Sequence, residues 1–319
     1  MCFKIQFFFK NLLIKGKVTT FLVYYTRVAS HSGSWYKDDP KLLAKEIGDY
    51  LSKSDKLEQY NSLKSIIVPH AGYRFCGPTA GKSFININPS NYDRVVVLGP
   101  SHHEYFEYCG LTPFESFETP FGNVRVDTET INKLLTNKKL FYTLSETTDV
   151  REHSIEMEMP FLKYIFNKKD FGLIPIMVGH NDLATNVEIG KALYDLYEDP
   201  KTLFVISSDF CHWGQKFGFT YYNEKYKNIW ESTRDLDEQA LNIISEMDSA
   251  KLDQYFKKTR NTICGRNPIT IVLSIIENYK KKHGDKKITF NKVGYDQSNK
   301  VKSMDERSVS YAAAVNFVM

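Results

Sequence analysis

The sequence has little glycine and proline, and its cysteines contain no CxxC pair. Gly (17) and Pro (11) together make up less than a tenth of the 319 residues, which excludes a collagen and a long low-complexity linker. The five cysteines are an odd number and lie far apart: Cys2, Cys76, Cys109, Cys211 and Cys264. This usage is typical of free thiols in a reducing compartment rather than of a disulfide framework. We therefore expect a cytoplasmic protein that can also reach the nucleus.

Acidic residues are absent from the first 37 positions, which hold six basic residues. The rest of the chain carries 36 basic and 38 acidic residues, so a nucleic-acid partner is not expected. Residues 1–26 are apolar, but Lys10, Lys15 and Lys17 interrupt them, which argues against a signal peptide and a membrane span. No other stretch is apolar enough to span a bilayer. We interpret residues 1–27 as an extension outside the main fold, with a targeting segment or a docked or membrane-surface strand as alternatives.

Short apolar runs, separated by helical patterns, fill the remainder of the chain. We expect strands over 64–69, 94–99, 173–179, 202–208, 287–295 and 308–318. We expect helices over 40–53, 78–86 (with Pro78 at the start), 128–136, 182–198, 231–247 and 267–281. This alternation predicts one α/β domain, residues 28–319, with a largely parallel central sheet and helices on both faces.

Polar residues that can do chemistry follow three of the expected strands. His70 follows the first, His102 and His103 follow the second, and Asp209 and His212 follow the fourth. Ligands bind beyond the carboxyl ends of parallel strands, and imidazole is both a metal ligand and an acid–base group. The sequence therefore predicts a site at this edge, although any one histidine taken alone is more often structural.

Further candidates lie away from the strand ends. His153 and Glu156 would share a helix face if the helix includes both, either as a hydrogen-bond cluster or in support of a metal; the alternative is a helix that begins only near Pro160. Cys264 precedes an apolar helix, where a thiolate is stabilised and can bind a soft metal; a small buried cysteine is the alternative. Trp35 and Tyr73 are either core aromatics or an apolar wall of a cleft. No nucleophile-elbow, P-loop, dinucleotide-binding or kinase sequence is present.

Seven motifs resemble those of the MEMO family (mediator of ErbB2-driven cell motility), in the same order and over residues 28–319. They are SHSGSWY (30–36), PHAGYRFCG (69–77), LGPSHH (98–103), EHSIEMEMPF (152–161), SSDFCHWG (207–214), NTICGRNPI (261–269) and SVSYAAA (308–314).

The resemblance implies a fold similar to the class III extradiol (LigB-type) nonheme iron dioxygenases, which hold iron with two His and one Glu. It implies that His70 and His102 are metal ligands here and that Cys264 replaces the Glu. It also implies a catalytic role for His212, with Asp209 beside it. We expect these residues to line or support the pocket: Trp35, Tyr73, His103, Glu152, His153 and Arg266.

The resemblance implies three alternative functions. The first is a MEMO-like protein that binds iron or copper, with zinc as a further candidate, in redox or metal handling and in cell-motility or cytoskeletal signalling. The second is a metal-dependent oxidase or dioxygenase that acts on a small molecule. The third is a metal-free adaptor for a phosphotyrosine-containing peptide. A thiolate ligand favours Cu(I), zinc or thiolate-bound iron over hard cations, and it argues against ordinary ring cleavage.

Overall fold

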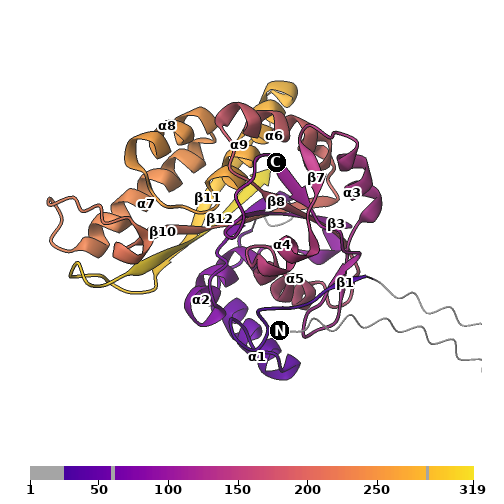
Figure 1. Ribbon diagram of the computed structural model, residues 1–319, viewed down its shortest axis with the longest axis horizontal. Coiled ribbons are helices and arrows are strands. Elements are labelled where there is room, and N and C mark those ends of the chain that lie inside the picture. The colour runs from indigo at the N-terminus through magenta and orange to yellow at the C-terminus, as the bar shows by residue number, and fades with distance from the viewer. Residues whose placement is uncertain (1–24, 59–61, 285–286) are drawn as a thin grey trace, which may run out of the picture.

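The computed structural model describes residues 25–58, 62–284 and 287–319 (Figure 1). Our interpretation of the N-terminal extension concerns residues 1–24 for the most part, and these lie outside the described residues. Among the helices in the described ranges, none combines the length and apolarity needed to cross a membrane.

A mixed sheet runs through the molecule, and its centre is parallel. Within the described residues it has nine strands, in the order β10-β12-β2-β9-β3-β8-β4-β7, with β11 also paired to β12. Strands β2, β9, β3 and β8 are mutually parallel, whereas β12 is antiparallel to β2 and β4 is antiparallel to β8. The strands are β2 (Leu63–Val68), β3 (Arg94–Pro100), β4 (Cys109–Leu111), β7 (Phe141–Thr143), β8 (Gly172–Val178), β9 (Thr202–Ser207), β10 (Asp209–Trp213), β11 (Ile288–Gln297) and β12 (Ser308–Val318). The expected α/β fold with a mostly parallel centre and flanking helices is confirmed.

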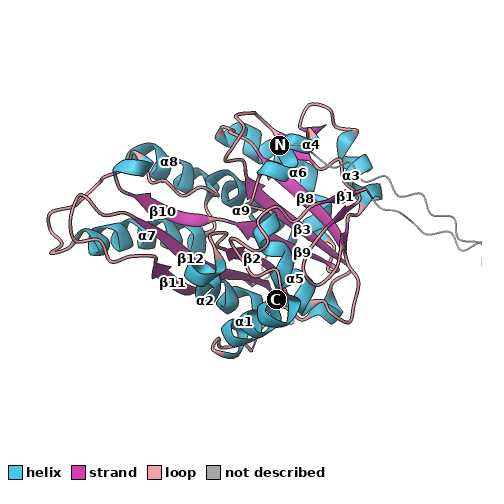
Figure 2. Ribbon diagram, turned by 60° about the horizontal axis from the view of Figure 1, so that its bottom comes forward, coloured by secondary structure: helices cyan, strands magenta, loops and turns pink. Residues whose placement is uncertain are grey.

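Helices cover both faces of this sheet (Figures 1 and 2). Helices α1, α2 and α5 lie on one face, and α6, α8 and α9 lie on the other. The helices are α1 (Pro40–Ser52), α2 (Tyr73–Phe84), α3 (Thr128–Leu135), α4 (Glu146–Arg151), α5 (Met159–Ile165), α6 (Leu183–Glu198), α7 (Ile229–Glu246), α8 (Ser249–Thr259) and α9 (Arg266–His283). A separate small sheet joins β1 (Thr26–Arg27), β5 (Ser116–Phe117) and β6 (Val124–Arg125).

The local sequence accounts for most of these elements. Every residue of β2, β8 and β9 is buried, as an apolar strand covered on both faces requires. Helix α1 begins after Asp39, whose carboxylate accepts hydrogen bonds from the Lys41 and Leu42 N–H groups. Asp182 caps α6 in the same way. Pro175 is tolerated in β8 because β4 pairs with that strand only from Ile176 onward.

Helix α2 begins earlier than its sequence predicts. It spans Tyr73–Phe84, so Pro78 lies inside the helix and not at its start. Pro78 has no N–H to donate one turn back, which normally disfavours a helix interior. The first turn has other anchors, since the Tyr73 N–H donates to Trp35 O (2.9 Å) and the Tyr73 hydroxyl donates to Met157 O (2.7 Å).

The residues directly after β9 form a further strand, which the apolar pattern of the sequence did not predict. Asp209–Trp213 form strand β10, which is antiparallel to β12. The side chains of Phe210, Cys211 and Trp213 are buried, so the apolar part of this motif is packed into the core while Asp209 and His212 face the site.

Arg27 anchors the first described segment in the core. Its guanidinium is 2% exposed and pairs with Asp149 (2.8 Å) and Glu156 (2.7 Å). It also donates to the backbone carbonyl of Glu152 (2.6 Å). A buried cation is tolerated only when it is paired and hydrogen-bonded, and Arg27 meets that requirement.

Replacing Arg27 should therefore destabilise the protein strongly. Arg27→Ala leaves two buried carboxylates without their cation, so we expect the free energy of unfolding to fall by about 3–5 kcal/mol. Urea denaturation measures this. Arg94→Ala is the matched control, because Arg94 is 38% exposed and its pairs with Asp127 and Asp199 are 3.9 and 3.6 Å long. That control should lose about 1 kcal/mol or less. Equal losses in the two variants would contradict a buried anchor.

Candidate metal centre

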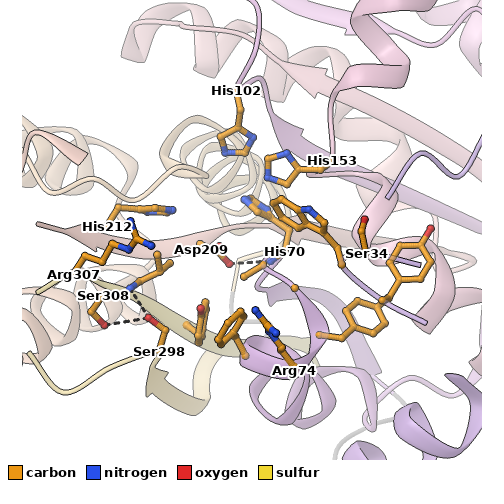
Figure 3. A pocket seen from close by; sticks show the side chains of 18 of the residues that line it. Ser34, His70, Arg74, His102, His153, Asp209, His212, Ser298, Arg307 and Ser308 are labelled. Carbon is orange, nitrogen blue, oxygen red and sulfur yellow. Dashed lines mark hydrogen bonds between the residues drawn. The ribbon is translucent and has the colours of Figure 1, made fainter. Parts of the chain in front are cut away.

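The carboxyl ends of the parallel strands open into one cleft of about 1030 Å³. His70 follows β2, His102 follows β3, and Asp209 and His212 lie on β10 directly after β9. All four line the cleft, as the strand-end argument predicts (Figure 3). His153 and Trp35 lie on the same wall.

Three side chains with metal-binding atoms meet at this cleft: His70 and His102 line it, and Cys264 contacts His70 without lining it. A nitrogen of His70, a nitrogen of His102 and the sulfur of Cys264 lie within 4.8 Å of one another. The Cys264 Sγ is 3.1 Å from His70 Nε2. These residues come from segments far apart in the sequence, and they are the three that the MEMO resemblance named.

His70 is held on two sides. Its backbone N–H donates to Asp209 Oδ1 (2.9 Å), and its Nδ1 is 2.7 Å from the Ser207 hydroxyl. The side chain is 1% exposed, and burial lowers the pKa of His70 well below its usual value. The imidazole is therefore neutral, as a metal ligand must be.

His102 is held by a buried carboxylate. Glu152 accepts from the His102 backbone N–H (2.6 Å) and lies 2.8 Å from its Nδ1. Burial alone would lower the pKa of His102, but hydrogen bonds with Cys264 and Glu152 raise it to about 10. A carboxylate on one imidazole nitrogen orients the other toward a metal, which here is the side of Cys264.

Cys264 precedes α9 and is fixed by the strand opposite. The Asp209 N–H donates to its sulfur (3.2 Å), and its own N–H donates to Asp209 O (3.3 Å). Burial raises the pKa of the Cys264 thiol. The thiol therefore keeps its proton near neutral pH unless a metal displaces that proton.

A second group of metal-binding types, His102, Glu152 and His153, has a different explanation. The Glu152 oxygens already accept from the backbone N–H groups of His102, His153 and Ser154 and contact His102 Nδ1. This carboxylate is therefore occupied as a hydrogen-bond acceptor. His153 stacks on His102 (ring centroids 4.5 Å apart), and burial lowers its pKa to about 3. It forms a neutral wall beside the centre.

Asp209 and His212 complete the floor of the cleft. Burial raises the pKa of Asp209 to about 7 and lowers the pKa of His212. His212 Nδ1 lies 2.9 Å from Phe210 O, a contact that requires the proton on Nδ1. The Nε2 of His212 then carries a lone pair, so this residue can accept a proton from a molecule in the cleft.

The remaining predicted residues fall into two groups. Trp35 and Tyr73 line the cleft, with Trp35 exposed at its rim and Tyr73 buried. His103 and Arg266 are not among the residues that line it. The ring of His103 lies at the edge of the histidine group, with its centroid 6.1 Å from that of His153. Arg266 is the first residue of α9.

Several residues that build the centre carried no recognisable pattern in the sequence. Ser207 and Glu158 lie behind His70, and Glu156 joins Arg27 to the loop that carries Trp35. The only signal was three glutamates in the otherwise largely apolar motif at 152–161. His153 and Glu156 do not share a helix face, because His153 lies before the short helical turn at 156–158; the helix begins at Met159, beside Pro160, as the alternative of a later start predicts.

Comparison with known proteins adds to this geometry. A family model described as Memo-like protein matches residues 27–315. The chain is 39% identical over 294 residues to Protein MEMO1 of Danio rerio, covering 92% of this chain and 97% of that protein. It is 37% identical over 295 residues to the Protein memo-1 homolog of Caenorhabditis elegans (92% and 83% covered) and 37% identical over 289 residues to Protein MEMO1 of Homo sapiens (90% and 96% covered).

Asp209 should make the metal-free protein less stable as the pH rises. Its carboxyl has a pKa of about 7 in the folded chain, against 3.8 for an unperturbed aspartate. Between these values the folded state holds a proton that the unfolded state has released, so raising the pH lowers the free energy of unfolding. Asp209→Asn removes this effect. We expect the wild type to lose stability relative to Asp209→Asn across this window, measured by urea denaturation with a chelator present.

The control variant, Asp182→Asn, should change the pH dependence of the free energy of unfolding in the opposite direction. Hydrogen bonds from the Thr185 backbone N–H and hydroxyl lower the pKa of Asp182, so Asp182→Asn should remove a contribution that grows as the pH rises. A stability difference between wild type and Asp209→Asn that stays constant with pH would show that Asp209 does not titrate as described.

Proposed function

This chain belongs to the Memo-like family, and from that premise we propose that it binds an iron or copper ion through His70, His102 and Cys264. The proposed role is redox or metal handling coupled to cell-motility or cytoskeletal signalling. The observation that supports metal binding is the convergence of two imidazoles and one thiol, each of which is held by its own hydrogen bonds.

The donor set fits a single metal ion. Thiolate and imidazole ligands at usual bond lengths lie about 3.5 Å apart around a tetrahedral centre. The Cys264 Sγ and His70 Nε2 are 3.1 Å apart, and all three ligand atoms lie within 4.8 Å. The Cys264–His70 pair therefore needs an adjustment of about 0.4 Å, and a pair at the 4.8 Å limit would need one of about 1.3 Å. A bound ion would supply Lewis acidity and a redox couple at the base of the cleft.

The chemistry of the three ligands favours soft or borderline ions. Thiolate and imidazole suit Cu(I), zinc and thiolate-bound iron, whereas Mg²⁺ and Ca²⁺ prefer oxygen ligands. Three protein ligands also leave room on the cleft side for another molecule. Zinc would fit the ligand set but would supply no redox chemistry.

A second function has support from the cleft itself. The cleft has space for a small molecule, and His212, with its Nε2 lone pair, lines it. This arrangement supports a metal-dependent oxidase or dioxygenase in which His212 removes a proton from the bound substrate. Asp209 would act through the His70 backbone, which it holds in place.

Metal content tests the leading proposal. In protein purified without oxygen, we expect about one iron or copper ion per chain in the wild type and loss of that ion in Cys264→Ser. Elemental analysis provides the measurement, and circular dichroism checks the fold. Cys76→Ser is the matched control, since its buried thiol already donates to Ala71 O (3.0 Å) and a hydroxyl can keep that bond.

The control should retain the metal. Full occupancy in Cys264→Ser would contradict the ligand assignment. A folded wild type that takes up neither iron nor copper would favour the third function, a metal-free adaptor. Binding of a phosphotyrosine peptide that survives chelation would support that role, and the exposed cations at the cleft, Arg74, Lys216 and Arg307, would contribute to it.

Oxygen consumption tests the second function. With a panel of catechols and thiols, we expect uptake by the metal-loaded wild type and a loss of about 100-fold or more in His212→Gln, because a proton acceptor is removed. The metal content of His212→Gln should stay at the wild-type level. Equal uptake by the two proteins would exclude His212 from the reaction.

A further inference from the structure

A buried set of hydrogen bonds lies behind His70, on the side away from the other two ligands. The Ser207 Oγ is 2.7 Å from His70 Nδ1, 2.6 Å from Ser154 O and 2.8 Å from Glu158 Oε1. Ser207, Ser154 and Glu158 are at most 1% exposed. None of these three residues lines the cleft.

Counting protons determines how these contacts are arranged. A hydroxyl donates one hydrogen bond and accepts others, whereas the carbonyl of Ser154 can only accept. The hydroxyl has one proton and two candidate acceptors, Ser154 O at 2.6 Å and Glu158 Oε1 at 2.8 Å, and we assign the proton to the shorter contact, with Ser154. The other two contacts are hydrogen bonds only if His70 and Glu158 donate to Ser207. This requires a proton on His70 Nδ1 and a proton on the Glu158 carboxyl.

Independent observations agree with this arrangement. Within the described part of the chain, no cationic side chain forms an ion pair with Glu158, and burial raises the pKa of Glu158 well above its usual value. On the other side of the ring, His70 Nε2 is 3.1 Å from Cys264 Sγ. That nitrogen can accept the thiol proton only if it carries none of its own.

We propose that Ser207 and Glu158 are positioning residues that fix His70 as the Nδ1–H tautomer, so that its Nε2 lone pair faces the metal position before any metal arrives. The two imidazoles are then oriented by different means. His102 is held by the carboxylate of Glu152, and His70 is held by a neutral hydroxyl that a protonated carboxyl supports. The tautomer is a property of the metal-free chain; only its consequence for metal affinity rests on the proposed function.

Nitrogen-15 NMR of metal-free protein with labelled histidines tests the tautomer. His70 is assigned by the signals that disappear in His70→Gln. We expect the Nδ1–H form in the wild type and its loss in Ser207→Ala. Ser83→Ala is the matched control, because this buried hydroxyl contacts the carbonyls of Ile67 (2.9 Å) and Ala314 (3.2 Å) and does not touch the centre. The control should keep the wild-type tautomer.

Glu158→Gln tests the proton on the carboxyl. An amide N–H can replace the donating O–H, so we expect this variant to keep the Nδ1–H form. An Nε2–H form in the wild type, or an unchanged tautomer in Ser207→Ala, would overturn the proposal. If Glu158→Gln loses the tautomer as Ser207→Ala does, the proton on Glu158 is wrongly assigned. Should Ser207→Ala fail to fold, the wild-type and Glu158→Gln spectra still decide.

Titration with Co²⁺ as the probe separates this inference from the proposed function. We expect Co²⁺ affinity to fall about 10–100-fold in Ser207→Ala, and to stay near the wild-type value in Glu158→Gln and Ser83→Ala. An affinity in Ser207→Ala equal to that of the wild type would contradict the positioning role. A wild type that binds no Co²⁺ but shows the Nδ1–H form would contradict the metal proposal and leave the tautomer assignment standing.

Discussion

The architecture of the centre depends on three carboxyl groups that the fold buries within one seven-residue segment. Glu152, Glu156 and Glu158 are each at most 2% exposed. A buried carboxyl is costly unless its oxygens find donors. Glu152 contacts the imidazole of His102. Glu156 accepts from Arg27 and from the loop before α1. Glu158 contacts the Ser207 hydroxyl, which lies behind His70. The need to satisfy these buried carboxyl groups therefore also fixes the imidazoles of His70 and His102 and the wall of the cleft.

Close backbone approach lets this segment reach the strand ends. A Cβ at Gly99, near the end of β3, would lie 2.5 Å from Ser154 Oγ, so a side chain there would push the segment away from His102. A Cβ at Gly265 would lie 2.3 Å from Ser208 Cβ, which would move Cys264 off the end of β9. Glycine at these two positions is a packing requirement, and the meeting of distant segments at the cleft follows from it.

The sequence predicts those parts of this centre that depend on local sequence patterns. Apolar runs fix the central strands, and the known direction of parallel strands places His70 and His102 at one edge. The position of Cys264 before a helix left its function open, and only the family resemblance grouped it with His70 and His102, because its neighbours in sequence do not indicate its neighbours in space. Ser207 and Glu158 could not be assigned, since a hydroxyl and a carboxyl 49 residues apart acquire a role only when β9 meets the segment before α5. The start of α2 was missed because Pro78 is normally a helix-start residue, and tertiary contacts of Tyr73 outweigh that preference here.

The charge balance of the centre constrains what can bind there. Burial raises the pKa of the Cys264 thiol, so a metal must displace the thiol proton before it can bind the thiolate. Burial also disfavours the charged form of Glu152, but hydrogen bonds with His102 lower the pKa of Glu152, so this carboxylate is negative beside the centre. Metal binding displaces protons from its ligands. With neutral imidazoles, the Cys264 thiolate and the Glu152 carboxylate together carry two negative charges. A dication balances both charges, whereas a monocation leaves one of them uncompensated. Burying an uncompensated charge is costly, so electrostatics favours a dication. The thiolate ligand favours a soft or borderline metal ion. Borderline dications such as Fe²⁺, Zn²⁺ and Cu²⁺ satisfy both demands, and Cu⁺ satisfies only the second.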